Sequence, residues 1–215
     1  MNEVPIKPNP KEVVAQGYNQ IAAEYLKWSG QVRQAERERY TSLVLAKLPS
    51  GAKVLDLGCG TGFLTAKVLA QRFQVTGADI SERHIALAQE NVPEATFIHA
   101  DMTKLVFPAD SFDGIVAFYS LIHLPREEQA DMLPRIAEWL CPGGLFVATF
   151  GIRSFDGEID DDWLGTTMYW SSYDSGTNKR LVEEAGLQII RAQEETAEEF
   201  DRPLTFLWIV AQKPE

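Results

Sequence analysis

Short apolar runs alternate with amphipathic stretches over most of the chain. Each run has the length and the bounding polar residues of a buried strand. The runs are Lys53–Leu57, Gln74–Asp79, Thr96–His99, Phe112–Phe118 and Leu145–Phe150. Between them, apolar residues recur every three or four positions, the spacing of a helix with one buried face. This alternation predicts an α/β fold, in which helices cover both faces of a mostly parallel sheet.

Residues typical of helix ends support this alternation. Residues 33–48 carry apolar side chains at helical spacing. Ser81 is a favourable N-cap for the stretch that follows it. Pro125, followed by two glutamates, predicts a helix that runs towards Leu140 with a kink at Pro134.

The end of the chain has a different rhythm. A helix closed by Gly186 precedes two apolar runs, at residues 187–196 and 204–213, with no helical pattern between them. These runs predict an antiparallel hairpin that completes the sheet. Residues 151–177 are rich in aromatic, acidic and glycine residues, and a segment of this length is typical of a loop or lid over a binding site.

No repeat or linker divides the sequence. A chain of 215 residues can bury one substantial core, so we expect residues 1–215 to form a single domain. Early prolines predict an irregular lead-in over residues 1–17.

Three glycines follow the first apolar run, in the stretch VLDLGCGTGFLT at residues 54–65. Glycine weakens both strands and helices, so Gly58, Gly60 and Gly62 indicate either a tight turn or a backbone that lies against a ligand. One glycine usually suffices for a turn, and in parallel sheets ligands bind beside the carboxyl ends of the strands. The cluster therefore favours a ligand.

Asp79 ends the next apolar run, 21 positions after Gly58. A carboxylate about 20 residues beyond a glycine turn can accept hydrogen bonds from the hydroxyls of a ribose. The alternative role for Asp79 is a cap for the helix near Ser81. Phe63 stands where the dinucleotide fingerprint has glycine or alanine, which disfavours a nicotinamide-dependent oxidoreductase.

Four stretches resemble, in order and spacing, the class I S-adenosylmethionine-dependent methyltransferases. The resemblance is strongest to the small-molecule, ubiquinone-biosynthesis-like group of methyltransferase types 11 and 25. The stretches are VLDLGCGTG (54–62), VTGADIS (75–81), HADMTKLVFPADSFDGIVAFYSLIHL (99–124) and LCPGGLFVATF (140–150). The resemblance implies a Rossmann-like seven-stranded sheet in the order 3-2-1-4-5-7-6, with strand 7 antiparallel. It also implies methyl transfer from S-adenosylmethionine to a small molecule.

The resemblance implies a set of cofactor-binding residues. They are Asp56, Gly58, Gly60, Gly62, Asp79, Ile80, Asp101, Met102 and Phe118. The first four would line the methionine and ribose portion, and Asp79 would hold the ribose hydroxyls. Ile80 would pack against adenine, while Asp101 and the Met102 backbone N–H would hydrogen-bond it. Phe118 would bring backbone near the sulfonium.

The N-terminal stretch YNQIAAEYLKW is similar to the family's capping helix, so residues 18–48 are expected to form cap helices. Tyr18 and Tyr25 lie seven positions apart and share one helical face. We expect Tyr18 to close over the cofactor and Tyr25 to belong to the core.

His123 follows the fourth strand, near where the methyl group should emerge. Three interpretations stay open: a general base, a wall of the pocket, or neither. A base is useful only for an acceptor N–H, O–H or C–H of high pKa. We expect His84 on the surface and His99 packed beside Asp101.

Residues 151–177 are expected to cover the acceptor. An aromatic wall would consist of Trp163, Tyr169, Trp170 and Tyr173. Asp160–Asp162 would attract a cationic acceptor, whereas Arg153 would pair with an acidic one. An exposed acidic turn with ordinary core aromatics remains an equal alternative.

The formal net charge of −11 opposes binding to nucleic acid or an anionic membrane, and disfavours an RNA methyltransferase. The two cysteines form no C-x-x-C pair, which disfavours a metal site or an arsenic methyltransferase and suggests the cytoplasm. We therefore expect a monomer or homodimer acting on a small molecule. A non-catalytic S-adenosylmethionine-binding protein is the alternative from another class.

Overall fold

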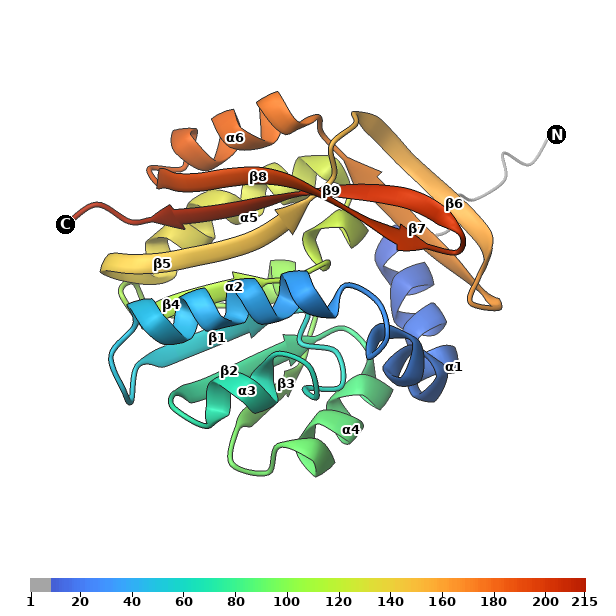
Figure 1. Cartoon of the computed structure of the whole chain (residues 1–215), viewed down its shortest axis with the longest axis horizontal. Coiled ribbons are helices and arrows are strands. Elements are labelled where there is room, and N and C mark those ends of the chain that lie inside the picture. Colours follow the sequence, from blue (N-terminus) through green and yellow to red (C-terminus); the bar gives the residue numbers. More distant parts are fainter. Residues whose placement is uncertain (1–8) are drawn as a thin grey trace, which may run out of the picture.

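The computed structural model describes residues 9–215 (Figure 1). The helices are α1 (Pro10–Ser29), α2 (Gln34–Lys47), α3 (Ala66–Ala70), α4 (Glu82–Asn91), α5 (Arg126–Trp139) and α6 (Ser175–Glu184). The strands are β1 (Lys53–Leu57), β2 (Gln74–Asp79), β3 (Thr96–His99), β4 (Phe112–Ala117), β5 (Leu140–Phe150), β6 (Phe155–Trp163), β7 (Thr166–Ser172), β8 (Gln188–Glu199) and β9 (Arg202–Gln212). Two short 3₁₀ helices, η1 (Met102–Lys104) and η2 (Leu121–His123), follow β3 and β4.

Seven strands form one sheet in the order β3-β2-β1-β4-β5-β9-β8. The first five pair in parallel, and β9 runs antiparallel to β5. The expected α/β fold is thus confirmed: β9 and β8 occupy the places of strands 7 and 6, and form the expected hairpin. The helix before β5 continues through Pro134, and β5 begins directly after it at Leu140 rather than at Leu145.

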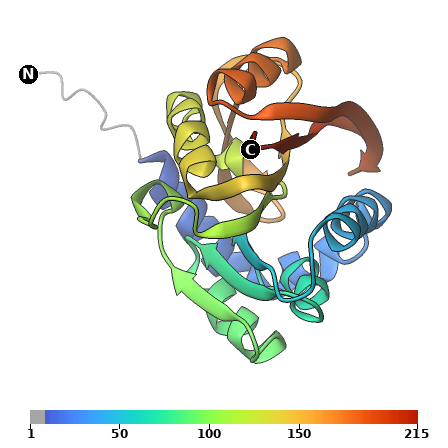
Figure 2. The same cartoon turned by 90° about the vertical axis from the view of Figure 1, so that its left-hand side faces the viewer.

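The central strands are buried on both faces because alternate side chains enter two separate cores. In β1, Leu55 belongs to the core under α5 and α6, whereas Val54 belongs to the core under α2 and α3. In β9, Ile209 likewise belongs to the core under α5 and α6, and Trp208 to the core under α2 and α3. Figure 2 shows α5 and α6 on the opposite side of the sheet from α2 and α3.

The segment 151–177 is mainly a hairpin, so its prediction as a loop was wrong. β6 and β7 pair antiparallel as a separate two-stranded sheet, with Ile159 opposite Tyr169. β6 is almost entirely exposed and acidic, so it has no apolar alternation to reveal a strand. It forms because β7 is held by packing on α1, where Met168 is fully buried.

The N-terminal helix lies across the end of the sheet where the parallel strands terminate (Figure 1). It begins at Pro10, so the predicted irregular lead-in was wrong for residues 10–17, while residues 1–8 lie outside the described part. Asn9 caps it by accepting from the Lys11 N–H. Within residues 9–215, no helix is both long and apolar enough to cross a membrane.

Gly17 allows α1 to approach β7 closely. A Cβ at this position would lie 2.7 Å from the backbone oxygen of Thr167 and 3.0 Å from the Met168 methyl carbon. These atoms leave no room for a side chain, so the close contact depends on glycine.

We expect Gly17→Ala to lower the free energy of unfolding by up to about 2 kcal/mol. Overpacking costs about 1–3 kcal/mol, which exceeds the gain of about 1 kcal/mol from helix propensity. Gly176→Ala in α6 is the matched control, because its Cβ would meet only the Asp174 carboxylate. Urea denaturation measures both variants, and equal stabilisation of the two would contradict the close contact.

Candidate active site

The glycine turn after β1 lies at the carboxyl edge of the sheet. The Gly58 N–H donates to the Ala78 carbonyl oxygen at 2.8 Å, which joins the turn to β2. Gly58 has a φ of +74°, and a Cβ there would lie 2.2 Å from the Ser120 Cβ. Gly60, with a φ of +55°, faces open space, its nearest neighbour being a Tyr25 ring carbon at 3.9 Å. The turn is therefore both tight and exposed to a cavity.

Asp79 connects this turn to the start of α4. Its two carboxylate oxygens accept from the Gly60 N–H and the Ser81 N–H, both at 2.8 Å. Burial alone would raise the pKa of Asp79, but the His84 ring and these two N–H groups outweigh burial and hold that pKa below its usual value. The helix cap itself is Ser81, whose hydroxyl accepts from the His84 N–H.

Two histidines differ from expectation. His84 is buried rather than on the surface, with its Nδ1 3.4 Å from Asp79 Oδ1 and its ring against Tyr18 and Tyr25. The reason is that α1 covers the first turn of α4, which the pattern within α4 cannot reveal. His99 is exposed rather than packed, and hydrogen-bonds the Ile80 carbonyl oxygen through Nε2 at 3.0 Å.

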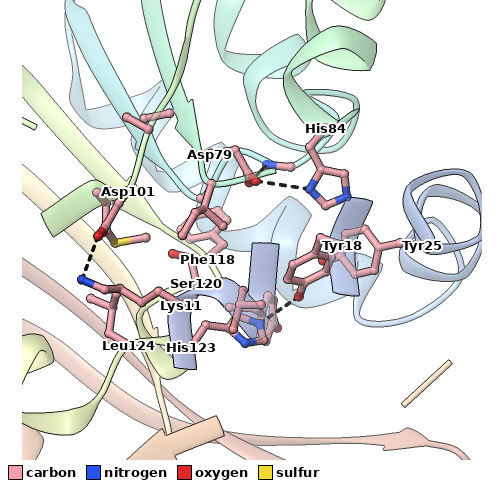
Figure 3. Close-up of a pocket in the computed structure, with 18 residues that line it drawn as sticks. Lys11, Tyr18, Tyr25, Asp79, His84, Asp101, Phe118, Ser120, His123 and Leu124 are labelled. Atoms are coloured by element: carbon pink, nitrogen blue, oxygen red, sulfur yellow. Dashed lines mark hydrogen bonds and ion pairs between the residues drawn. The ribbon is translucent and has the colours of Figure 1, made fainter. Parts of the chain in front are cut away.

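An inner cavity of about 60 Å³ opens beside the turn (Figure 3). Most of the cofactor residues suggested by the sequence line it: Tyr18, Gly58, Gly60, Asp79, Ile80, Asp101, Met102 and Phe118. Tyr25 packs against the hydrophobic cluster of α1 and β7, as expected of a core residue, and it also lines this cavity. The side chains of α1 cover this cavity and keep it narrow.

Two of the suggested residues do not reach the inner cavity. Gly62 instead makes room for the side chains of Ala88 and Phe97, each 3.2 Å from where its Cβ would lie. Asp56 is buried beneath the turn, and its Oδ2 has no hydrogen-bond partner among residues 9–215. Burial raises the pKa of Asp56 to about 7, with Arg37 lowering it and Asp79 raising it further.

Two basic residues were not anticipated from the sequence. Lys11 of α1 pairs with Asp101 and Glu128, each at 2.7 Å, at one side of the inner cavity. Arg37 of α2 lies over the Tyr119 ring, and its Nε is buried without an acceptor in the described chain. Both side chains act on residues far away in sequence, so no local motif indicates them.

Tyr18 and His123 meet at one end of the inner cavity (Figure 3). His123 Nδ1 lies 2.9 Å from the Tyr169 carbonyl oxygen, which only accepts, so Nδ1 carries the proton. His123 Nε2 then accepts from the Tyr18 hydroxyl at 2.8 Å. Burial lowers the pKa of His123 to about 4, so its ring is neutral at neutral pH.

A second cavity, the outer groove of about 730 Å³, adjoins the first and shares Tyr18, Tyr25, Tyr119 and His123 with it. Its walls come from α1, the segment before α2, the β6–β7 hairpin and the tip of the β8–β9 hairpin. Trp163 and Trp170 line it as the aromatic-wall interpretation expects, whereas Tyr169 and Tyr173 do not. Acidic and basic groups are both present on it: Arg153, Asp160 and Asp161.

Known proteins support the interpretation of this site. The sequence family described as "Methyltransferase domain" matches residues 54–144. Trans-aconitate 2-methyltransferase of Variovorax paradoxus (strain S110) is 39% identical over 115 residues, which are 51% of this chain and 43% of that protein. Residues 54–144 therefore match a methyltransferase domain, and the relatives that share 32–39% identity with the chain over longer or overlapping stretches bear methyltransferase names.

Solved structures of this methyltransferase fold match the chain over nearly its whole length. Magnesium protoporphyrin IX methyltransferase (ChlM) from Synechocystis PCC 6803, with bound S-adenosylmethionine, has a TM-score of 0.75 and 19% identity, covering 98% of this chain and 100% of its own. The [4+2]-cyclase SpnF also has a TM-score of 0.75, with 20% identity and 98% of each chain covered. The chain spans about half the length of curated relatives it matches, namely 43%, 46% and 59% of three of them.

The buried Asp56 carboxyl should make stability depend on pH. Its folded pKa of about 7 exceeds its usual value, so the folded state binds more protons and stability falls as pH rises towards 7. We expect the free energy of unfolding of Asp56→Asn, relative to that of the wild type, to rise by about 2–3 kcal/mol from pH 5 to pH 8. Urea denaturation at the two pH values measures this difference, with the exposed Asp131→Asn as control. A difference that stays constant with pH would contradict a protonated Asp56.

Proposed function

We propose that this chain transfers the methyl group of S-adenosylmethionine to a small-molecule acceptor bound in the outer groove. The observation that carries the proposal is the arrangement of two joined cavities. The inner one contains Asp79, Asp101 and the glycine turn, and the outer one meets it at Tyr18 and His123. The lining residues of such an arrangement suit a nucleoside cofactor on one side and an acceptor on the other. The inner cavity, at about 60 Å³, would have to widen, by displacement of the α1 side chains that cover it, to admit the whole cofactor.

The donors and acceptors of the inner cavity fit this cofactor. A carboxylate has about four acceptor sites, so each Asp79 oxygen retains capacity for a ribose hydroxyl after accepting one backbone N–H. Asp101 would accept from the adenine amino group, sharing its carboxylate with Lys11. Arg37 lines the adjoining outer groove, and its unpaired Nε would suit the carboxylate of the methionine end.

The bound cofactor would supply an electrophilic methyl group on a sulfonium. The chain would then contribute alignment and exclusion of water, because holding two reactants in line lowers a barrier by roughly 7–11 kcal/mol in favourable cases. Tyr18, His123 and Trp163 are all nearly fully buried where the cavities meet. A dry junction of this kind favours transfer from sulfur to the acceptor over reaction with water.

The acceptor does not follow from the family. Relatives bear the names of a trans-aconitate and a magnesium protoporphyrin IX methyltransferase, which differ widely in acceptor. SpnF has the same fold but is named a [4+2]-cyclase, which is a different reaction. A non-catalytic binder therefore remains the competing function, and only turnover distinguishes it.

Calorimetry followed by a turnover screen tests the proposal. We expect S-adenosylmethionine and S-adenosylhomocysteine to bind, and nicotinamide dinucleotides not to. The screen measures S-adenosylhomocysteine release over phenols, amines, thiols and carboxylates. Binding with no release from any acceptor class would favour the non-catalytic binder, and no binding at all would refute both.

Asp79→Ala should weaken S-adenosylhomocysteine binding by about 1.5–3 kcal/mol, the size of hydrogen bonds to a charged group, or about 10- to 150-fold in Kd. Calorimetry measures the loss, and circular dichroism checks that the variant is folded. Glu90→Ala removes the same charge from an exposed position at the far end of α4 and serves as the control. Equal affinities of the two variants would leave Asp79 only a structural role.

A further inference from the structure

Tyr18 and His123 both line the two cavities, and their side chains hydrogen-bond each other at 2.8 Å. The surroundings of this pair determine which of the two side chains donates the hydrogen bond. The Tyr169 carbonyl oxygen requires the proton on His123 Nδ1, so Nε2 offers a lone pair to the Tyr18 O–H. A hydroxyl that donates one hydrogen bond can still accept others, so the Tyr18 oxygen can accept from a further donor, with Tyr25 as its neighbour in the cavity.

We propose that Tyr18 and His123 form a proton relay for an acceptor hydroxyl, and that the acceptor is a flat aromatic alcohol. The inference rests on the proposed function. The acceptor O–H donates to the Tyr18 oxygen, and the Tyr18 O–H donates to His123 Nε2. Tyr18 is the catalytic residue that touches the acceptor, and His123 receives the proton through it.

The step balances in atoms and charge. A bond forms between the acceptor oxygen and the methyl carbon while the carbon–sulfur bond breaks and its electron pair stays on sulfur. The acceptor proton moves to Tyr18, and the original Tyr18 proton moves to His123. The products are a methyl ether, a neutral thioether and one imidazolium, so the positive charge of the sulfonium reappears on His123.

The electrostatics of the junction support this order of transfer. Burial, then the nearby Tyr25 and Asp79, raise the pKa of Tyr18 well above its usual value, so Tyr18 stays protonated and cannot start as the base. His123 is neutral at neutral pH and has its acceptor nitrogen already aimed at Tyr18. Proton transfer must therefore pass through Tyr18 to His123 rather than end on Tyr18.

The walls around the pair indicate an aromatic acceptor. The Trp170 ring lies 4.3 Å from the His123 ring, and the Trp163 ring lies 5.8 Å from the Tyr18 ring, measured between centroids. Phe155 and Phe206 line the groove further out. Flat aromatic ligands pack well among such rings, and no exposed ion of the groove is needed to hold them.

A carboxylate acceptor fits this junction less well. Of the two arginines of the groove wall near Tyr18, Arg33 is buried and already paired with Glu36 and Glu199, and Arg37 lies over the Tyr119 ring. Arg37 lines the outer groove and opposes the burial that raises the pKa values of Asp56, Tyr18 and Tyr25, so a carboxylate acceptor would compete for it with the methionine end of the cofactor. A carboxylate also carries no proton that the relay could receive.

Binding of three matched naphthalenes to the protein saturated with S-adenosylhomocysteine tests the relay. We expect 2-naphthol to bind about 3- to 10-fold more tightly than 2-methoxynaphthalene or 2-naphthoate, the effect of one hydrogen bond. Tyr18→Phe should abolish this preference. His123→Asn should abolish it too, because the freed Tyr18 hydroxyl can then donate to either ether or alcohol. Tyr173→Phe, a tyrosine outside both cavities, should retain it.

A second measurement tests the relay in the absence of any acceptor, through the protonation state and tautomer of His123. In ¹⁵N spectra of the histidine rings with S-adenosylhomocysteine bound, His123 should be neutral at pH 7 with its proton on Nδ1. Tyr18→Phe should shift the Nε2 signal, whereas Tyr173→Phe should not. A proton on Nε2, or a Tyr18→Phe spectrum identical to the wild type, would overturn the relay.

The outcomes separate the two proposals. Tighter binding of 2-naphthoate, or no binding of any naphthalene while S-adenosylhomocysteine binds, would overturn the aromatic alcohol and leave methyl transfer standing. Failure of S-adenosylhomocysteine itself to bind would overturn the proposed function. With a phenol found in the turnover screen, His123→Asn should lower kcat by about 10²- to 10⁴-fold with KM for S-adenosylmethionine unchanged.

Discussion

One buried carboxylate, that of Asp79, holds the glycine turn against the start of α4. An ionised carboxylate away from water is costly unless hydrogen bonds replace its hydration. The Gly60 N–H and the Ser81 N–H supply those bonds, and the His84 ring lies 3.4 Å away, so the turn and the helix depend on each other. The glycine turn and Asp79 line the inner cavity together because β1 and β2 pair in parallel and end at the same edge of the sheet.

Helix α1 completes the site from outside the sheet. Its Val14, Tyr18 and Ile21 pack with Trp163 and Met168 of the β6–β7 hairpin in one hydrophobic cluster. The inner cavity lies beneath that helix and the outer groove lies beside it. Since α1 and β7 are distant in sequence, only tertiary packing brings the walls of the two cavities together. Tyr18 and His123 lie where the two cavities meet.

Local patterns in the sequence were enough for the sheet and for part of the site. Buried parallel strands are short apolar runs, so β1, β2 and β3 could be delimited residue by residue. The glycine turn and Asp79 follow from spacing along adjacent strands. The burial of His84 and the hairpin at residues 155–172 could not be predicted, because each depends on contact with α1 rather than on its own periodicity.

The charge balance of the proposed reaction explains why a weak base suits this junction. Each turnover would leave one proton on His123, inside a groove walled by tryptophans. With a pKa of about 4, His123 does not retain that proton once water returns, so the ring is neutral again before the next acceptor arrives. A stronger base would remain charged against apolar walls and lose its acceptor nitrogen. The acceptor oxygen itself becomes strongly acidic as it is methylated, so the driving force for proton transfer comes from the acceptor and not from the basicity of the histidine.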